Sequence, residues 1–229
     1  MSFQDLFNRW KSKYKFEAFI SDGIVDEKCY EKPHILFILR DMNSKEERDL
    51  CEDLRTDGSG WKTWNNVARW IQALLDGDSN YPNRITKESR VQQLRRIAVM
   101  NLKKEHGGPH VDGEQLKQSV LDHKEFILEE VKLCTPELII CCGLSSVGVM
   151  GNAVLMKEYV FSYTSDWMMI ESDKLNRSWR YYFAEVDKRK IPVVEFSHPQ
   201  ATILSGKRGH ELFEALYCDM LKVKEELLY

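Results

Sequence analysis

No apolar run in this chain approaches the roughly 20 residues that a transmembrane helix needs. The first residues, MSFQDLFNRW, also lack the basic segment followed by an apolar stretch that marks a secretory signal. We therefore expect a protein that stays in the cytoplasm and has no membrane partner, although these absences do not distinguish cytoplasm from nucleus.

Cysteine pairs with the spacing of metal ligands are missing as well. The six cysteines include no Cys-x-x-Cys motif, and they stand at positions 29, 51, 134, 141, 142 and 218. The spacing of His106, His110 and His123 does not suit metal binding by a helix either. We therefore predict reduced, structural thiols and neither a metal nor another cofactor. Cys141 and Cys142 are adjacent in an apolar run, where neighbouring strand residues point to opposite faces.

The chain has no excess of positive charge, because its formal net charge is −3. Proteins held to nucleic acid by bulk electrostatics are usually basic, so any DNA binding here requires a local basic surface. The turn after the first apolar run also lacks the Gly-x-Gly-x-x-Gly pattern of dinucleotide-binding folds. The 229 residues, 43% hydrophobic and 30% charged, suit one globular domain over residues 1–229 with no internal repeat.

Short apolar runs of the kind that form strands buried on both faces occur four times, at 34–39, 96–102, 137–144 and 191–198. Apolar residues at helical spacing predict helices at about 3–20 and at 64–75, 126–134 and 212–227. Between residues 159 and 186, WMMIES and SWRYYFAEV indicate a hairpin or added edge strands. We therefore predict an α/β fold, a three-layer α/β/α sandwich with a mainly parallel central sheet of about four strands.

Three of the predicted strands end in residues with obvious chemical use, namely Asp41, Asn101 and His198. In open α/β sheets, ligands bind beyond the carboxyl ends of the strands. We therefore expect these three side chains to converge on one cleft.

The motifs around these residues resemble those of the uracil-DNA glycosylase superfamily. The resemblance is carried by LRDMN, IAVMNLKK and SHPQATILSGKRGHELFEAL and extends over residues 33–225. It implies a single glycosylase-like domain that acts on DNA, in which Asp41 activates or positions water and Asn101 reads the base edge. It also implies that His198 stabilises the leaving base.

These residue types suit cleavage of an N-glycosidic bond. A carboxylate can stabilise the oxocarbenium-like transition state, and a hydrogen-bond donor can stabilise the departing base anion. A flipped base also needs an aromatic stacking partner, for which we favour Trp61, because Trp64 shares a helical face with apolar residues. The segment after His198 supplies candidates for a wedge and for phosphate contacts: Ile203 and Leu204 for the wedge, and Ser205, Gly206, Lys207 and Arg208 for the phosphates.

The first motif departs from the superfamily pattern at three positions. Leu39 replaces a glycine, Met42 stands where proline is usual, and Asn43 stands where tyrosine or glycine is usual. In uracil-specific members the tyrosine excludes the thymine methyl group. We predict that Asn43 contacts the base at this position, but its side chain cannot exclude the methyl group in the same way. The expected substrate is therefore uracil or a related modified base. The four spaced cysteines of the iron–sulfur branch are absent.

Simpler interpretations of the same residues stay open. Asp41 could be a helix cap or a turn residue, and His198 a turn residue hydrogen-bonded to backbone. The run from Lys103 to Gly108 is either a solvated loop or a loop that approaches a phosphate. A protein that binds DNA or nucleotides without turnover, and a hydrolase of free nucleosides or nucleotides, are the alternatives to a DNA glycosylase.

Overall fold

The computed structural model describes residues 1–42, 44, 46–59, 62–105 and 112–228. Within them, one main sheet has seven strands in the order β2-β5-β3-β6-β9-β8-β7. The four central strands are mutually parallel: β5 Ala98–Asn101, β3 Ile35–Leu39, β6 Leu138–Cys142 and β9 Arg189–Phe196. They coincide with the four apolar runs, so the predicted α/β fold is confirmed. The sheet as a whole is mixed, because the pairs β2–β5, β7–β8 and β8–β9 are antiparallel.

The predicted strand number was too low, because antiparallel strands extend both edges of the parallel core. At one edge lies the two-residue β2 (Gly23–Ile24), which is too short to form a recognisable apolar run. At the other edge, β8 (Ser178–Val186) pairs with β9 and with β7 (Met168–Glu171). β7 and β8 form the hairpin that was predicted from WMMIES and SWRYYFAEV.

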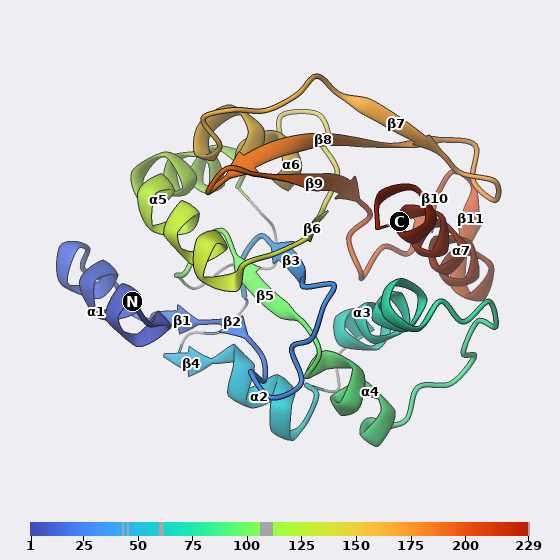
Figure 1. Ribbon diagram of the computed structural model, residues 1–229, viewed down its shortest axis with the longest axis horizontal. Coiled ribbons are helices and arrows are strands. Elements are labelled where there is room, and N and C mark those ends of the chain that lie inside the picture. The colour runs from blue at the N-terminus through green and yellow to red at the C-terminus, as the bar shows by residue number, and fades with distance from the viewer. Residues whose placement is uncertain (43, 45, 60–61, 106–111, 229) are drawn as a thin grey trace.

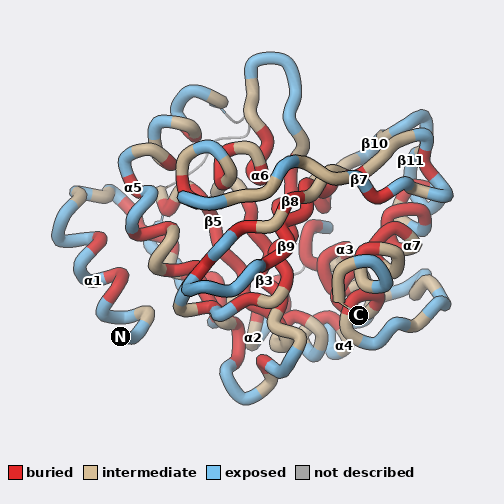
Figure 2. The backbone as a smooth tube through the Cα atoms, turned by 45° about the horizontal axis from the view of Figure 1, so that its top comes forward, coloured by how far each residue is buried: buried red, intermediate tan, exposed pale blue. Residues whose placement is uncertain are grey.

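Helices cover both faces of this sheet (Figure 1). One face carries α1 Phe3–Lys13, α5 Gly113–Cys134, α6 Asn152–Leu155 and the π-helical turn Met156–Val160. The other carries α2 Leu50–Thr56, α3 Lys62–Ile71, the π-helical turn Gln72–Asp76, α4 Lys87–Leu94 and α7 Gly209–Leu227. In Figure 2 the buried residues run along the central strands and the inner sides of the helices.

The alternation of side chains along the central strands explains their uninterrupted apolar sequence. Phe37 and Leu39 of β3 belong to the core cluster beneath α3 and α7, whereas Leu36 and Ile38 belong to the cluster beneath α1 and α5. All five residues of β3 are buried, as expected for a strand covered on both sides. Cys141 and Cys142 likewise fall into opposite clusters, which confirms the prediction from their adjacency.

The N-terminal helix is shorter than predicted. It begins after a capping box formed by Ser2 and Asp5 and ends at Lys13 instead of near residue 20. The apolar residues with helical spacing that indicated this helix end at Trp10, and the chain after Lys13 packs on the core through Phe16 and Phe19 without forming a helix. Ile20–Ser21 instead forms β1, which pairs in parallel with β4, Arg48–Asp49.

No helix in the described ranges is long and apolar enough to cross a membrane.

Candidate functional site

The order of the central strands brings three of the predicted residues, Asp41, Asn101 and His198, to the carboxyl edge of the sheet. Asn101 ends β5, Asp41 follows β3, Gly143 follows β6, and His198 follows β9. Because these strands are parallel neighbours, their carboxyl ends lie along the same edge in the order Asn101, Asp41, Gly143 and His198. The carboxyl edge of the sheet, where these strand ends lie, is therefore the candidate site.

His198 is held in one neutral tautomer. Its Nδ1 accepts a hydrogen bond of 3.1 Å from the backbone N–H of Gln200, so the ring proton of the neutral form is on Nε2. Burial, and next the positive charge of Arg40, lowers the pKa of His198 below its ordinary value. The interpretation of His198 as a turn residue bonded to backbone is thus correct for Nδ1. Nε2–H can donate to a group that becomes negative.

The turn that carries His198 is fastened to the first part of α3. The Asn66 side-chain amide donates to the Pro199 carbonyl at 2.6 Å, and the Gln200 amide donates to Oγ1 of Thr63 at 2.6 Å. Asn66 is 2% exposed, so its hydrogen bond is made away from water. These contacts fix the direction of the imidazole, which a donor at a reacting atom requires.

Arg40 is the residue of this edge that sequence reasoning did not select. Its Nη2 donates to the Leu144 carbonyl at 3.2 Å, while its Nε is buried without a hydrogen-bond partner. Gly143 has φ +119°, and a Cβ there would lie 3.1 Å from that Nε. The side chain of Arg40 therefore extends from β3 across the end of β6, in the direction of β9 and His198. Its place between an apolar strand and Asp41 was the available signal.

Asp41 lies beside this cation. Burial lowers the pKa of Arg40, and the negative charge of Asp41 opposes that effect. The alternative that Asp41 caps a helix is wrong, because α2 begins at Leu50 and Asp49 accepts from the backbone N–H of Glu52 at 3.0 Å. Asp41 therefore follows β3 with a carboxylate whose charge acts on Arg40.

Asn101 is tied to a buried acidic group. Its backbone N–H and its Nδ2 donate to Oδ2 of Asp22 at 2.7 and 3.2 Å, and the residue is 2% exposed. The amide nitrogen is thus turned toward Asp22. Whether its carbonyl end reads a base stays a prediction from the sequence.

Asp22 belongs to a charged cluster in the interior. Lys104 contacts the carboxyl groups of both Asp22 and Glu130, the latter at 2.8 Å, and all three side chains are fully buried. Burial, and next the charge of Asp22, raises the pKa of Glu130 well above its ordinary value. Lys104 also lies 5.5 Å from the ring centre of Trp10. The solvated-loop interpretation is therefore wrong for Lys104.

The segment after His198 forms a small hairpin. β10, Ile203–Leu204, pairs antiparallel with β11, Lys207–Arg208, through Ser205 and Gly206 at φ +47° and +80°. Two residues with positive φ are typical of the tight turn that matches strand twist. The two residues predicted to form the wedge differ in exposure, because Ile203 is 50% exposed whereas Leu204 packs against the core. The predicted phosphate contacts also differ, because Lys207 forms an ion pair with Glu211 and Arg208 is exposed.

The tryptophans and histidines considered in the sequence divide into two groups. Trp64 is 3% exposed in the core, as predicted, and Nδ1 of His123 accepts from the Trp10 indole at 3.1 Å. The predicted base contacts Trp61 and Asn43, and also His106 and His110, lie outside the described residues. Among the residues that are described, no three His, Cys, Asp or Glu side chains are grouped as metal ligands.

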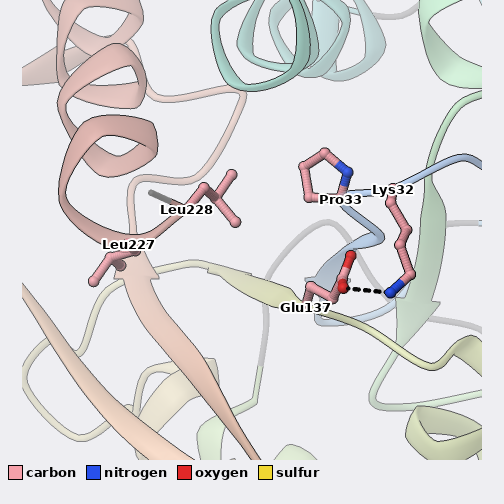
Figure 3. Close-up of a pocket in the computed structure, with 5 residues that line it drawn as sticks. All are labelled: Lys32, Pro33, Glu137, Leu227 and Leu228. Atoms are coloured by element: carbon pink, nitrogen blue, oxygen red, sulfur yellow. Dashed lines mark ion pairs between the residues drawn. The ribbon is translucent and has the colours of Figure 1, made fainter.

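A surface pocket lies at the opposite, amino-terminal edge of the sheet (Figure 3). Lys32, Pro33 and Glu137 precede β3 and β6, and Leu227 and Leu228 come from the end of α7. The Lys32–Glu137 ion pair of 3.1 Å spans part of it. None of the predicted site residues lines this pocket.

No protein-family model matches this chain, and a search of curated proteins found no relative.

Proposed function

We propose that this protein is a divergent member of the uracil-DNA glycosylase superfamily that hydrolyses the N-glycosidic bond of uracil or a related modified base in DNA. The observation that carries the proposal is the state of His198. A neutral imidazole, oriented through Nδ1, offers its Nε2–H at the same sheet edge as Asp41. A fixed donor and a carboxylate are what this cleavage requires.

The reaction breaks the bond between C1′ of the deoxyribose and the base nitrogen. The bonding electrons leave with the base, whose developing negative charge accepts a hydrogen bond from His198 Nε2–H. Asp41 faces the positive charge that develops on the sugar and orients a water molecule. The water oxygen forms the new bond to C1′, and its released proton passes by way of the Asp41 carboxylate to the base.

The small hairpin supports DNA as the substrate. Ile203 offers an exposed apolar side chain for the space that a flipped nucleotide leaves, and Arg208 is paired with it across the hairpin. This arrangement supplies a local basic and apolar surface to a chain whose net charge is −3.

The test is abasic-site formation on single- and double-stranded oligonucleotides that carry uracil, hypoxanthine or hydroxymethylated bases. Asp41→Asn is expected to abolish base release while the unfolding transition stays that of the wild type. If the wild-type protein releases none of these bases, the proposal is wrong.

A second candidate is hydrolysis of free nucleosides or nucleotides, which the ion pair between Lys207 and Glu211 favours because it removes one basic group from DNA binding. A comparison of free deoxyuridine with a uracil-containing oligonucleotide separates the two activities.

A third candidate is binding without turnover. The reason for considering it is that the bulk of Leu39 and Met42 could close the pocket of the first motif. Both side chains are buried in the core cluster beneath α3 and α7, which weakens the argument for binding without turnover.

A further inference from the structure

Arg40 is a partly buried cation that no carboxylate neutralises by direct contact within the described chain. It forms no ion pair there, its Nη2 donates to a carbonyl, and its Nε is buried without an acceptor. A guanidinium can donate five hydrogen bonds, and the described residues accept one from the Arg40 side chain. Burying a cation without an anionic partner costs free energy. Such a cation is typical of a site that binds an anionic ligand, because the ligand then supplies the missing partner.

The surroundings of Arg40 place that unused capacity at the candidate site. The side chain extends over Gly143, where a Cβ would lie only 3.1 Å from Nε, so the missing side chain makes room for the cation. The positive charge of Arg40 contributes to the lowered pKa of His198, and the negative charge of Asp41 acts on Arg40. The side chain of Arg40 thus crosses the end of β6, the strand between β3, which precedes Asp41, and β9, which precedes His198.

We propose that Arg40 is a further catalytic residue of this site, whose guanidinium binds the oxygen atom on which negative charge accumulates as the base leaves. This inference rests on the proposed glycosylase function. Arg40 donates a second hydrogen bond beside His198 Nε2–H and adds a full positive charge, which the neutral histidine lacks. No proton is transferred by Arg40, and the base departs as an anion held by two donors.

The same surroundings favour a base oxygen over a phosphate. A phosphate at Arg40 would be brought close to the Asp41 carboxylate and the Leu144 carbonyl, both of which repel a second concentrated negative charge. A leaving base carries one negative charge spread over its ring, which reduces that repulsion. Inorganic phosphate is therefore a suitable competitor in the test.

The test compares leaving groups of different quality in otherwise identical oligonucleotides. Fluorine at C5 stabilises the departing anion, so 5-fluorouracil needs less help from the protein than uracil does. For Arg40→Gln we expect single-turnover base release to fall about 100-fold with uracil but only about tenfold with 5-fluorouracil. Arg40→Lys should recover part of the uracil rate, since it restores charge without the planar fork.

Arg177→Gln is the matched control, because Arg177 also has a buried Nε without a partner but its guanidinium lies 4.2 Å from the Trp179 ring. It should leave the ratio of the two rates unchanged. An equal loss on both substrates in Arg40→Gln would show that Arg40 is only structural and would overturn the inference.

A binding measurement separates failure of this inference from failure of the proposed function. If the wild type releases neither base, the glycosylase proposal fails, and the role of Arg40 is then judged by affinity for free 5-nitrouracil, an anion at neutral pH. The wild type should bind it at least about tenfold more tightly than uracil, and Arg40→Gln should lose this preference. Absence of the preference, or displacement by millimolar inorganic phosphate in an Arg40-dependent manner, contradicts the assignment to a base oxygen.

Discussion

The backbone N–H of Gln200 donates a 3.1 Å hydrogen bond to Nδ1 of His198. The contact is made within one turn, which α3 holds through Asn66 and Thr63. A proton on Nδ1 would face the N–H of Gln200, so this geometry favours the neutral ring with its hydrogen on Nε2. The tautomer is thus set by the local backbone, before any ligand is bound.

Replacing His198 tests the donor directly. We expect His198→Ala to lower base release by about 10²- to 10³-fold, the usual effect of removing one donor to a developing anion. His198→Gln keeps a side-chain N–H and should retain more activity. Single-turnover rates measure both variants, and far-ultraviolet circular dichroism verifies that they fold. Wild-type rates in His198→Ala would rule out its role as donor.

The pH dependence of stability should also report on His198. Burial and Arg40 lower its pKa, so between the ordinary value near 6.5 and the lowered value the unfolded chain binds the proton and the folded protein does not. The stabilising contribution is complete above about pH 6.5 and is lost as the pH falls toward the lowered pKa. His198→Gln should therefore lose less stability than the wild type between about pH 7 and about pH 5 in urea unfolding. A titration by NMR in Arg40→Gln should show the His198 pKa moving upward.

The parallel strands, and the positions of Asp41 and His198 near their carboxyl ends, could be predicted because their signals are local. The four apolar runs mark the central strands, and Asp41 and His198 each lie two residues after the end of one of them. The contacts of Lys104 could not be predicted in this way, because its partner Asp22 is 82 residues away and its partner Glu130 is 26 residues away, in α5. A lysine beside a glutamate in a polar run looks solvated until tertiary packing encloses it.

The buried cluster gives a prediction about stability. Lys104→Met removes the cation and leaves the Asp22 carboxylate buried, which should lower the free energy of unfolding by about 3–5 kcal/mol. Glu130→Gln should cost much less, because the raised pKa of Glu130 means that a neutral carboxyl group is replaced by a neutral amide. Chemical unfolding at neutral pH measures both. Equal losses would show that Glu130 carries a charge in the folded protein.

The sign of the pH effect of Glu130 is opposite to that of His198. Above its ordinary pKa near 4.5 the unfolded chain loses the Glu130 proton while the folded protein keeps it, so stability decreases as the pH rises toward the raised value. Glu130→Gln removes this titration. The difference in stability between the wild type and this variant should therefore shift in favour of the variant as the pH rises from about 4 to about 7.

Gly143 should be required for both stability and base release, because of its backbone conformation and its contact with Arg40. Its φ of +119° is unfavourable for any other residue, and an added Cβ would press on Nε of Arg40. We expect Gly143→Ala to cost about 1–3 kcal/mol of stability and to lower base release by displacing Arg40. Gly148→Ala is the control, since Gly148 also has positive φ, +72°, but no atom lies within 4 Å of its added Cβ. If both variants keep full activity, Gly143 does not position Arg40.

The hairpin residues Lys207 and Arg208 should contribute unequally to DNA affinity. Lys207 is held by Glu211, so binding a phosphate would first break that ion pair, whereas Arg208 is exposed at the hairpin end. Arg208→Ala should weaken binding to a uracil-free duplex and lower the slope of log affinity against log salt by about 1. Lys207→Ala should change the slope less, and Glu211→Gln should strengthen binding by releasing Lys207. Fluorescence anisotropy over a salt series measures all three, and identical slopes in the two basic variants would show that the Glu211 ion pair does not persist when DNA is bound.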